Sequence, residues 1–254
     1  MAQDDKKVNQ FRRGFLGTTL KAIPVAAITA VSAGKVASAI PEAPGSVDSM
    51  SDLPEKPIEY MPRFFNDEEY DFIQSAVDLL IPEDELGPGA IAAGVPEFID
   101  RQMDTPYGHG QLWYMKGPFH PEIMKQTPTL GYQLNMTPRD IYKSGIMAFN
   151  QWCIDRYKRQ FVDLNHQEQN EAMTLLSDGK IEFPDDTVFA SVFFSQLWGN
   201  CKEGFFSDPM YGGNRDMTGW QMVGFPGARG DYLDWANRYN VEYPLPPVSI
   251  LPKK

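Results

Sequence analysis

The sequence has few of the residues that most enzymes and metalloproteins use for their chemistry. Its 254 residues include two cysteines and three histidines, and the histidines are scattered at His109, His120 and His166. It contains no His-Glu-x-x-His motif, no paired-cysteine zinc motif and no Cys-x-x-Cys-His motif for haem attachment. A dinucleotide fingerprint, a phosphate-binding Gly-Lys-Ser/Thr loop and a Gly-x-Ser-x-Gly elbow are missing as well. We therefore expect no catalytic residues, no metal site and no cofactor site in this chain.

Basic residues are scarce after the first 39 positions. Those positions hold six of the 23 Lys/Arg residues and two of the 34 Asp/Glu residues, so the remainder carries a formal charge of −15. A surface of that sign repels nucleic acid phosphates and anionic lipid headgroups. We therefore expect no nucleic acid partner and no direct membrane binding.

The first 39 residues have the layout of an export signal. Basic residues precede an apolar stretch at residues 22–31, and the small-residue run at 37–39 offers Ala37 and Ala39 to a signal peptidase. The adjacent Arg12 and Arg13, followed by Gly-Phe-Leu, resemble the twin-arginine (Tat) signal, which is read by a receptor. The alternative is a disordered basic tail. The prediction is a signal peptide at residues 1–39 and a periplasmic protein.

Cys153 and Cys201 are separated by 48 positions. The periplasm permits a disulfide between them, which would stabilise the fold by about 4 kcal/mol through loop closure. A Tat substrate folds in the reducing cytosol, however, so its core cannot depend on that bond. Three alternatives stay open: a disulfide between the two cysteines, two buried free thiols, or one thiol bonded to a partner subunit.

Residues 40–62 are rich in proline, serine and acidic residues and have no apolar periodicity. This composition predicts an extended arm. The arm is either a mobile tether or a segment that lies across a partner, since Ile58, Tyr60 and Met61 supply apolar side chains near its end.

The rest of the chain predicts a single all-α domain over residues 63–254, with about five main helices and long irregular segments at both ends. Apolar side chains recur at helical spacing, and capping residues mark the starts. Five helices are predicted. The first begins at Asn66 and ends before Pro82, and the second begins at Pro96. The third runs from Thr137 to about Phe161, the fourth from Asn165 to Gly179, and the fifth begins after Asp185-Asp186. The acidic runs Asp67-Glu68-Glu69 and Asp185-Asp186 are explained by helix capping, so a glycosidase-like carboxylate pair is not supported.

Residues 208–230 contain six glycines and two prolines, which we take to exclude regular helix or strand. Hydrophobic residues occur along the segment. We therefore expect a folded loop that lies against another protein, with Trp220 and Tyr211 as its main anchors. Gly213 would be required there if its backbone has a positive φ. The predicted partner interface comprises Tyr211, Gly212, Gly213, Asn214, Trp220, Phe225 and Pro226.

The same segment closely resembles the signature of the gluconate 2-dehydrogenase subunit 3 family. The resemblance rests on Asp-Pro-Met-Tyr-Gly-Gly-Asn at 208–214, on Gly219-Trp220 and on Gly224-Phe225-Pro226-Gly227. The twin arginines, Leu79-Leu80-Ile81-Pro82 and Gly131-Tyr132 before Thr137-Pro138 also fit. The similarity covers essentially the whole chain after the signal.

The resemblance implies a non-catalytic small subunit of a membrane-associated sugar or sugar-acid dehydrogenase. In that family, FAD and the substrate site belong to a large subunit of the glucose–methanol–choline type. A cytochrome c subunit with haem c passes electrons to the membrane. The small subunit stabilises the large one and carries it through the Tat pathway to the periplasmic face of the inner membrane. The alternatives from other classes are a self-sufficient periplasmic enzyme acting on sugars and an independent sugar-binding protein, for which Trp113 and Trp220 could stack on the sugar.

Overall fold

The computed structural model describes residues 60–112, 115–123, 133–184 and 188–251. The chain divides into one unit at residues 1–55 and a second at 56–254, and all described residues belong to the second. The predicted signal residues Arg12, Arg13, Ala37 and Ala39 lie outside the described residues, as does most of the predicted arm. The boundaries of the signal, arm and domain therefore stay predictions.

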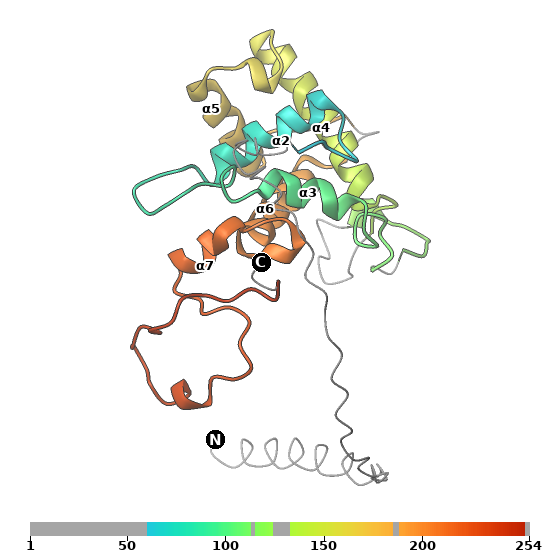
Figure 1. Ribbon diagram of the computed structural model, residues 1–254. Helices are drawn as coiled ribbons and strands as arrows, with labels where there is room; N and C mark the ends of the chain where they lie inside the picture. The colour runs from blue at the N-terminus through green and yellow to red at the C-terminus, as the bar shows by residue number, and fades with distance from the viewer. Residues whose placement is uncertain (1–59, 113–114, 124–132, 185–187, 252–254) are drawn as a thin grey trace, which may run out of the picture. The chain divides into compact units, whose positions relative to one another are not determined.

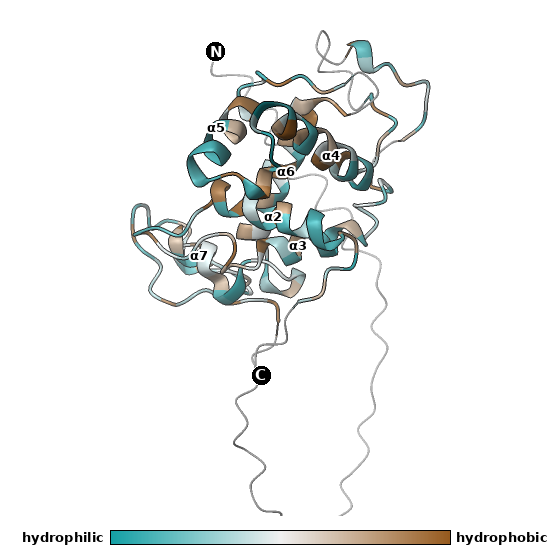
Figure 2. Cartoon of the chain, turned by 90° about the horizontal axis from the view of Figure 1, so that it is seen from above, coloured by the Kyte–Doolittle hydropathy of each residue, from teal (hydrophilic) through white to brown (hydrophobic). Residues whose placement is uncertain are grey.

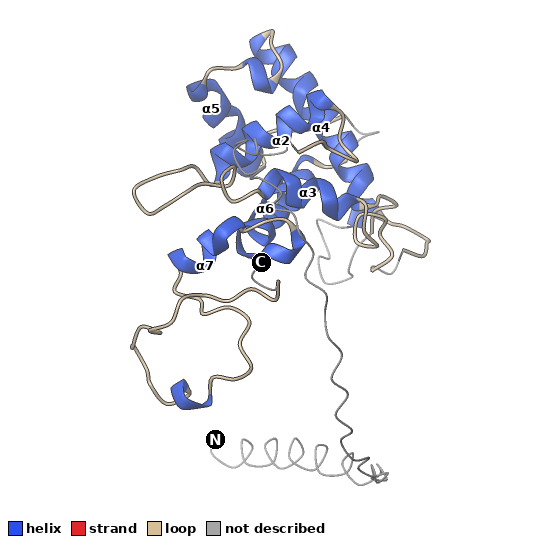
Figure 3. Ribbon diagram, viewed as in Figure 1, coloured by secondary structure: helices blue, strands red, loops and turns tan. Residues whose placement is uncertain are grey.

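The described residues confirm the predicted all-α fold (Figure 1). Figure 3 shows helices and loops but no strand in this part of the chain. Five helices have nine or more residues, and a sixth has five. They are α2 (Asp67–Leu80), α3 (Val95–Met103), α4 (Pro138–Tyr157), α5 (His166–Ser177), α6 (Ala190–Phe206) and α7 (Thr218–Met222).

Three helix starts are fixed by capping boxes, as the sequence predicts. Before α2, the Asn66 side chain accepts a hydrogen bond from the Glu69 amide, and the Glu69 carboxylate accepts one from the Asn66 amide. The same reciprocal pairing occurs at Thr137 with Asp140 and at Asn165 with Glu168. Each box satisfies two amides that the first helical turn leaves without partners.

Three predicted boundaries are corrected. Helix α4 ends at Tyr157, four residues early, because Lys158 adopts a left-handed conformation with φ of 62°. Helix α6 begins at Ala190 with Phe189 as its N-cap, and the expected cap residues Asp185 and Asp186 lie outside the described residues. The glycine-rich segment contains helix α7, because the run Thr218–Met222 has one glycine, too few to prevent a single turn.

The core lies where α2, α3, α4 and α5 pack against α6. Phe193 of α6 is fully buried, and its ring lies 6.1 Å from the ring of Phe72 in α2. Phe149 and Phe161 continue this cluster at centroid distances of 5.2 to 6.0 Å from Phe72. Gly145 lets α4 approach α6, because a Cβ there would overlap the Phe193 ring. Figure 2 shows the two-sided character of α4 and α6, which carry both hydrophobic and hydrophilic residues.

Among the described residues, no helix combines the length and the apolar character that crossing a bilayer requires.

Candidate functional site

The segment at residues 208–227, called here the signature segment, is held by Asn214. This side chain is fully buried. Its Nδ2 donates to the Ser207 carbonyl at 2.8 Å, and its Oδ1 accepts from the Gly219 amide at 2.8 Å. One asparagine thereby joins the end of α6 to the start of α7. The predicted interface residue Asn214 thus has a structural role that its type explains, since a side-chain amide donates through its nitrogen and accepts through its oxygen.

Trp220 also points inward. Its side chain is 6% exposed, its Nε1 donates to the Phe206 carbonyl at 2.7 Å, and its ring lies edge-on to Phe225 at 5.1 Å. A ring this buried has little surface to offer a partner. The structure therefore places Trp220 among the residues that close the chain's own fold, although its expected contribution to partner binding stays a prediction.

The glycines of the signature segment allow close backbone approach. Of the adjacent pair Gly212 and Gly213, it is Gly212 that has a positive φ, at 100°. A Cβ on Gly213 would instead overlap the Gly204 carbonyl oxygen of α6, and a Cβ on Gly212 would lie 2.9 Å from Nη1 of Arg101. Gly213 is thus required for close packing against α6, and Gly212 is favoured by its positive φ. We had expected Gly213 to be required if its φ were positive, and its φ is not positive.

Asp208 connects the signature segment to the end of the chain. Its Oδ1 accepts hydrogen bonds from the Met210 amide at 3.0 Å and from Ser249 Oγ at 2.6 Å, and its Oδ2 accepts from the Ile250 amide at 2.9 Å. Burial raises the pKa of this carboxyl, but the three hydrogen bonds outweigh that effect, so the pKa is lowered. The ionised carboxylate is therefore the form that holds residues 249 and 250.

Other predicted interface residues face solvent. Tyr211 is 49% exposed and Phe225 is 45% exposed, whereas Pro226 is half-buried. Tyr211 lines a surface pocket of about 390 Å³ between α3 and the end of α6. Four more exposed apolar residues lie near them in the sequence, outside the predicted interface: Phe206, Met210, Met222 and Val223. The predicted interface thus separates into buried residues that shape the segment and exposed ones that can contact a partner.

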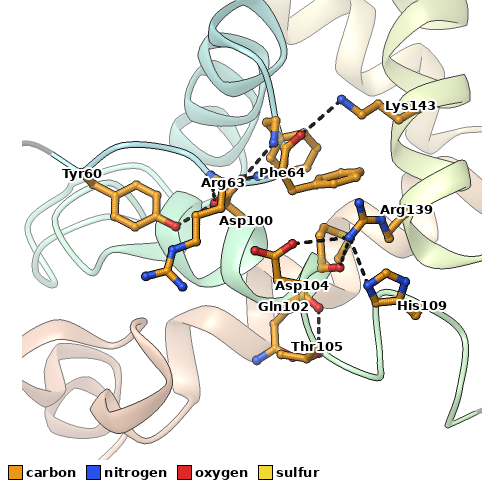
Figure 4. Close-up of polar contacts among 12 residues, drawn as sticks. Tyr60, Arg63, Phe64, Asp100, Gln102, Asp104, Thr105, His109, Arg139 and Lys143 are labelled. Carbon is orange, nitrogen blue, oxygen red and sulfur yellow. Dashed lines mark hydrogen bonds and ion pairs between the residues drawn. The ribbon is translucent and has the colours of Figure 1, made fainter.

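Asp100 is a structural residue that the sequence analysis missed. Its fully buried carboxylate accepts four hydrogen bonds, from Tyr60 Oη and Arg63 N, both at 2.7 Å, and from the amides of Phe64 and Phe65, both at 3.0 Å (Figure 4). An acidic residue between the buried Ile99 and Met103 on an amphipathic helix was the available signal. The end of the predicted arm is thus bound to α3 of its own chain.

The two cysteines are free and fully buried in the structure. Burial raises the pKa of each thiol to about 12. The structure therefore matches the second of the three alternatives, two buried free thiols. A thiol in this state reacts slowly, because the thiolate is the reactive form.

The histidines are not brought together. Nε2 of His109 lies 3.3 Å from Nη1 of Arg139, which also donates to the Met103 carbonyl at 2.9 Å (Figure 4). His120 pairs with Glu122 at 2.9 Å, and His166 contacts Asn170. Over the described ranges, no three His, Cys, Asp or Glu residues form a group that could hold a metal ion. Trp113, considered for sugar stacking, lies outside the described residues.

A second polar cluster lines a pocket of about 380 Å³ on α6. Asn200 is buried at its centre. Its Oδ1 accepts from Tyr142 Oη at 3.0 Å, while its Nδ2 donates to Tyr107 Oη and to Glu203 Oε2, both at 2.8 Å. Burial raises the pKa of Tyr142, which keeps this phenol protonated as a donor. These groups satisfy one another, so the cluster serves packing between α4 and α6.

One family model matches the chain. It is described as Gluconate 2-dehydrogenase subunit 3, and it covers residues 67–227, from the start of α2 to the end of the signature segment. No curated protein and no solved structure matches the chain.

Proposed function

The chain belongs to the gluconate 2-dehydrogenase subunit 3 family, and on that basis we propose that it is the non-catalytic small subunit of a periplasmic, FAD-dependent sugar or sugar-acid dehydrogenase complex. The family name places it in a multi-subunit assembly. Its proposed role is to stabilise the large catalytic flavoprotein and to escort it through the Tat pathway.

The observation that carries this proposal is the match over residues 67–227, which ends with the signature segment. The polar residues of that segment support it. Asp208 and Asn214 use their side chains to hold the backbone, so both are committed to shaping the chain. A segment shaped this way, with Tyr211 and Phe225 exposed beside it, fits a docking role better than a reacting one.

The proposed cofactors lie in the partners. FAD belongs to a large subunit of the glucose–methanol–choline type, and haem c belongs to a cytochrome subunit that receives the electrons. The complex, and not this chain, would then contact the membrane. The formal charge of −11 agrees with membrane contact through the partners and not through this chain, because an acidic chain is not attracted to anionic lipid.

Co-expression tests the role as a subunit. The chain expressed alone from residue 40 is expected to show no flavin absorbance and no dehydrogenase turnover with gluconate, glucose or fructose. Co-expressed with the large flavoprotein of its own organism, it is expected to co-purify and to raise the yield of soluble, flavin-loaded enzyme. Turnover by the isolated chain would favour the self-sufficient enzyme, and stoichiometric sugar binding would favour the sugar-binding protein.

Substitution of the twin arginines tests the role in export. Arg12→Lys with Arg13→Lys is expected to leave both subunits in the cytoplasm, because the Tat receptor distinguishes guanidinium from ammonium. Lys6→Arg with Lys7→Arg also preserves charge and serves as the control, with export unchanged. Normal periplasmic dehydrogenase activity in the first variant would refute the escort role.

A further inference from the structure

The chain beyond the family match forms a closed loop. Residues 228–247, called here the C-terminal loop, begin and end at a bridge between Gly227 and Val248. The Ala228 amide donates to the Val248 carbonyl at 2.6 Å, and the Val248 amide donates to the Pro226 carbonyl at 3.2 Å. Figures 1 and 3 show this segment as a wide loop with one short 3₁₀ helix, Leu233–Trp235. The loop is therefore anchored at both ends on the signature segment.

Internal contacts give the loop a defined conformation. Tyr243 contacts Trp235 at 5.1 Å and Tyr232 at 6.0 Å between ring centroids. The guanidinium of Arg229 lies 5.1 Å from the Tyr243 ring centroid, and that of Arg238 lies 4.6 Å from the Trp235 ring centroid. Rings and guanidiniums from the two sides of the loop thus hold each other, so the remaining side chains are presented from a shaped segment.

The remaining apolar side chains have no cover. No residue from 228 to 251 is buried, and Leu233 and Tyr239 are each 79% exposed. Val241 and Leu245 are also exposed. Ordering such a loop costs conformational entropy that its own contacts, made without burial, offset poorly. Exposed apolar side chains on this loop are explained if a partner surface buries them.

The charge of the loop identifies the class of that surface. Residues 228–251 carry two arginines, three acidic residues and no lysine, in a chain of formal charge −11. An anionic bilayer attracts segments rich in Lys and Arg, and this one has a net negative charge. Tyrosine, tryptophan and arginine beside exposed leucine and valine are instead the composition of protein–protein interfaces.

We propose that the C-terminal loop is the docking arm of this subunit and that it inserts Leu233, Tyr239 and Val241 into apolar pockets of the large catalytic subunit. This inference rests on the proposed function. Because the loop lies outside the family match, it would select this chain's own partner, while the exposed Tyr211 and Phe225 supply the adjoining contact surface. Asp208 and Gly227 fix the base of the loop, so they act on docking through its position.

Matched leucine substitutions test the proposal. Leu233→Asp places a charge on the loop. Leu86→Asp places the same charge in the turn after α2, at a leucine of nearly the same exposure, 77% against 79%. Each subunit is purified separately, and titration calorimetry measures the affinity of each variant for the large flavoprotein. The melting temperature of each isolated variant is measured as well. We expect Leu233→Asp and Tyr239→Asp each to weaken binding at least tenfold, Leu86→Asp to stay within twofold, and all melting temperatures to be unchanged.

Two outcomes separate the loop from the proposed function. If the wild-type chain binds the flavoprotein and both loop variants bind equally well, the loop assignment is overturned and the small-subunit role stands. If the wild-type chain binds no flavoprotein, the proposed function fails and the loop assignment fails with it. Flotation with vesicles of phosphatidylethanolamine and phosphatidylglycerol tests the membrane alternative. Wild-type flotation that Leu233→Asp abolishes, with flavoprotein binding intact, would overturn the proposal in favour of a lipid surface.

Discussion

Helices α2 to α6 bury their large apolar side chains, whereas the C-terminal loop exposes its own. In the helices, Phe72, Phe149 and Phe193 are fully buried, and the Phe72 ring contacts both of the others. In the loop, Leu233 and Tyr239 are almost fully exposed, although the two regions belong to one chain. The comparison indicates that the helical body is stable from its own contacts, whereas the residue types of the loop are explained by a surface outside the chain.

The largest expected effect is in the helical body. Phe193→Ala leaves a cavity where α2, α4 and α6 meet and is expected to lower the free energy of unfolding by about 3–5 kcal/mol. Leu233→Ala in the loop is expected to change it by no more than about 0.5 kcal/mol. Urea unfolding of the isolated chain measures both. Equal losses in the two variants would remove the distinction between the regions.

The next effect separates buried from exposed residues inside the signature segment. Trp220→Ala is expected to destabilise the isolated chain by about 3 kcal/mol, since it removes a buried ring and leaves the Phe206 carbonyl without its donor. Phe225→Ala, at the exposed neighbour, is expected to cost less than half as much and to weaken partner binding instead. A Trp220→Ala variant with an unchanged melting temperature but lost binding would restore Trp220 as the anchor.

Asp100 tests whether residues 60–65, where the predicted arm joins the domain, belong to the stable body. Asp100→Asn removes the charge and replaces one acceptor oxygen by a donor facing donors, so we expect a loss of roughly 2–3 kcal/mol and faster hydrogen exchange at residues 63–65. Asp104→Asn, one helical turn away at an exposed ion pair with Arg139, is the control and should cost at most about 0.5 kcal/mol. Unchanged exchange in Asp100→Asn would contradict this account of the junction between the arm and the domain.

The smallest effect concerns the base of the loop and depends on pH. The pKa of Asp208 is lowered below its ordinary value of 3.8 in the folded chain. Its stabilising contribution is therefore complete above that value and is lost as the pH falls through the folded pKa. We expect the loop to detach at low pH, which pepsin cleavage within residues 228–247 would detect between about pH 4 and pH 2. In Asp208→Asn, cleavage should be fast and nearly independent of pH over that range.

The helices could be predicted because their signals are local. Asn66 with Glu69, Thr137 with Asp140 and Asn165 with Glu168 satisfy helix-end amides three residues away, so each pair is visible in the sequence. The start of α6 was misplaced because Phe189 has no capping side chain, and Val188 instead donates its amide to Ser144 Oγ of α4 at 3.1 Å. That contact joins residues 44 positions apart, which no local pattern reveals.

The sequence by itself determined the all-α class and the family, and it predicted the export signal and an interface at residues 208–227, because these depend on spacing, charge and motif. The tertiary structure alone decided that Asn214 and Trp220 point inward while Tyr211 and Phe225 point outward, since burial depends on how α6 and α7 pack. It also decided that Asp100 binds the end of the arm and that Asp208 binds residues 249 and 250. A carboxylate shows its charge in the sequence, but its hydrogen-bond partners exist only after the chain brings distant amides to it.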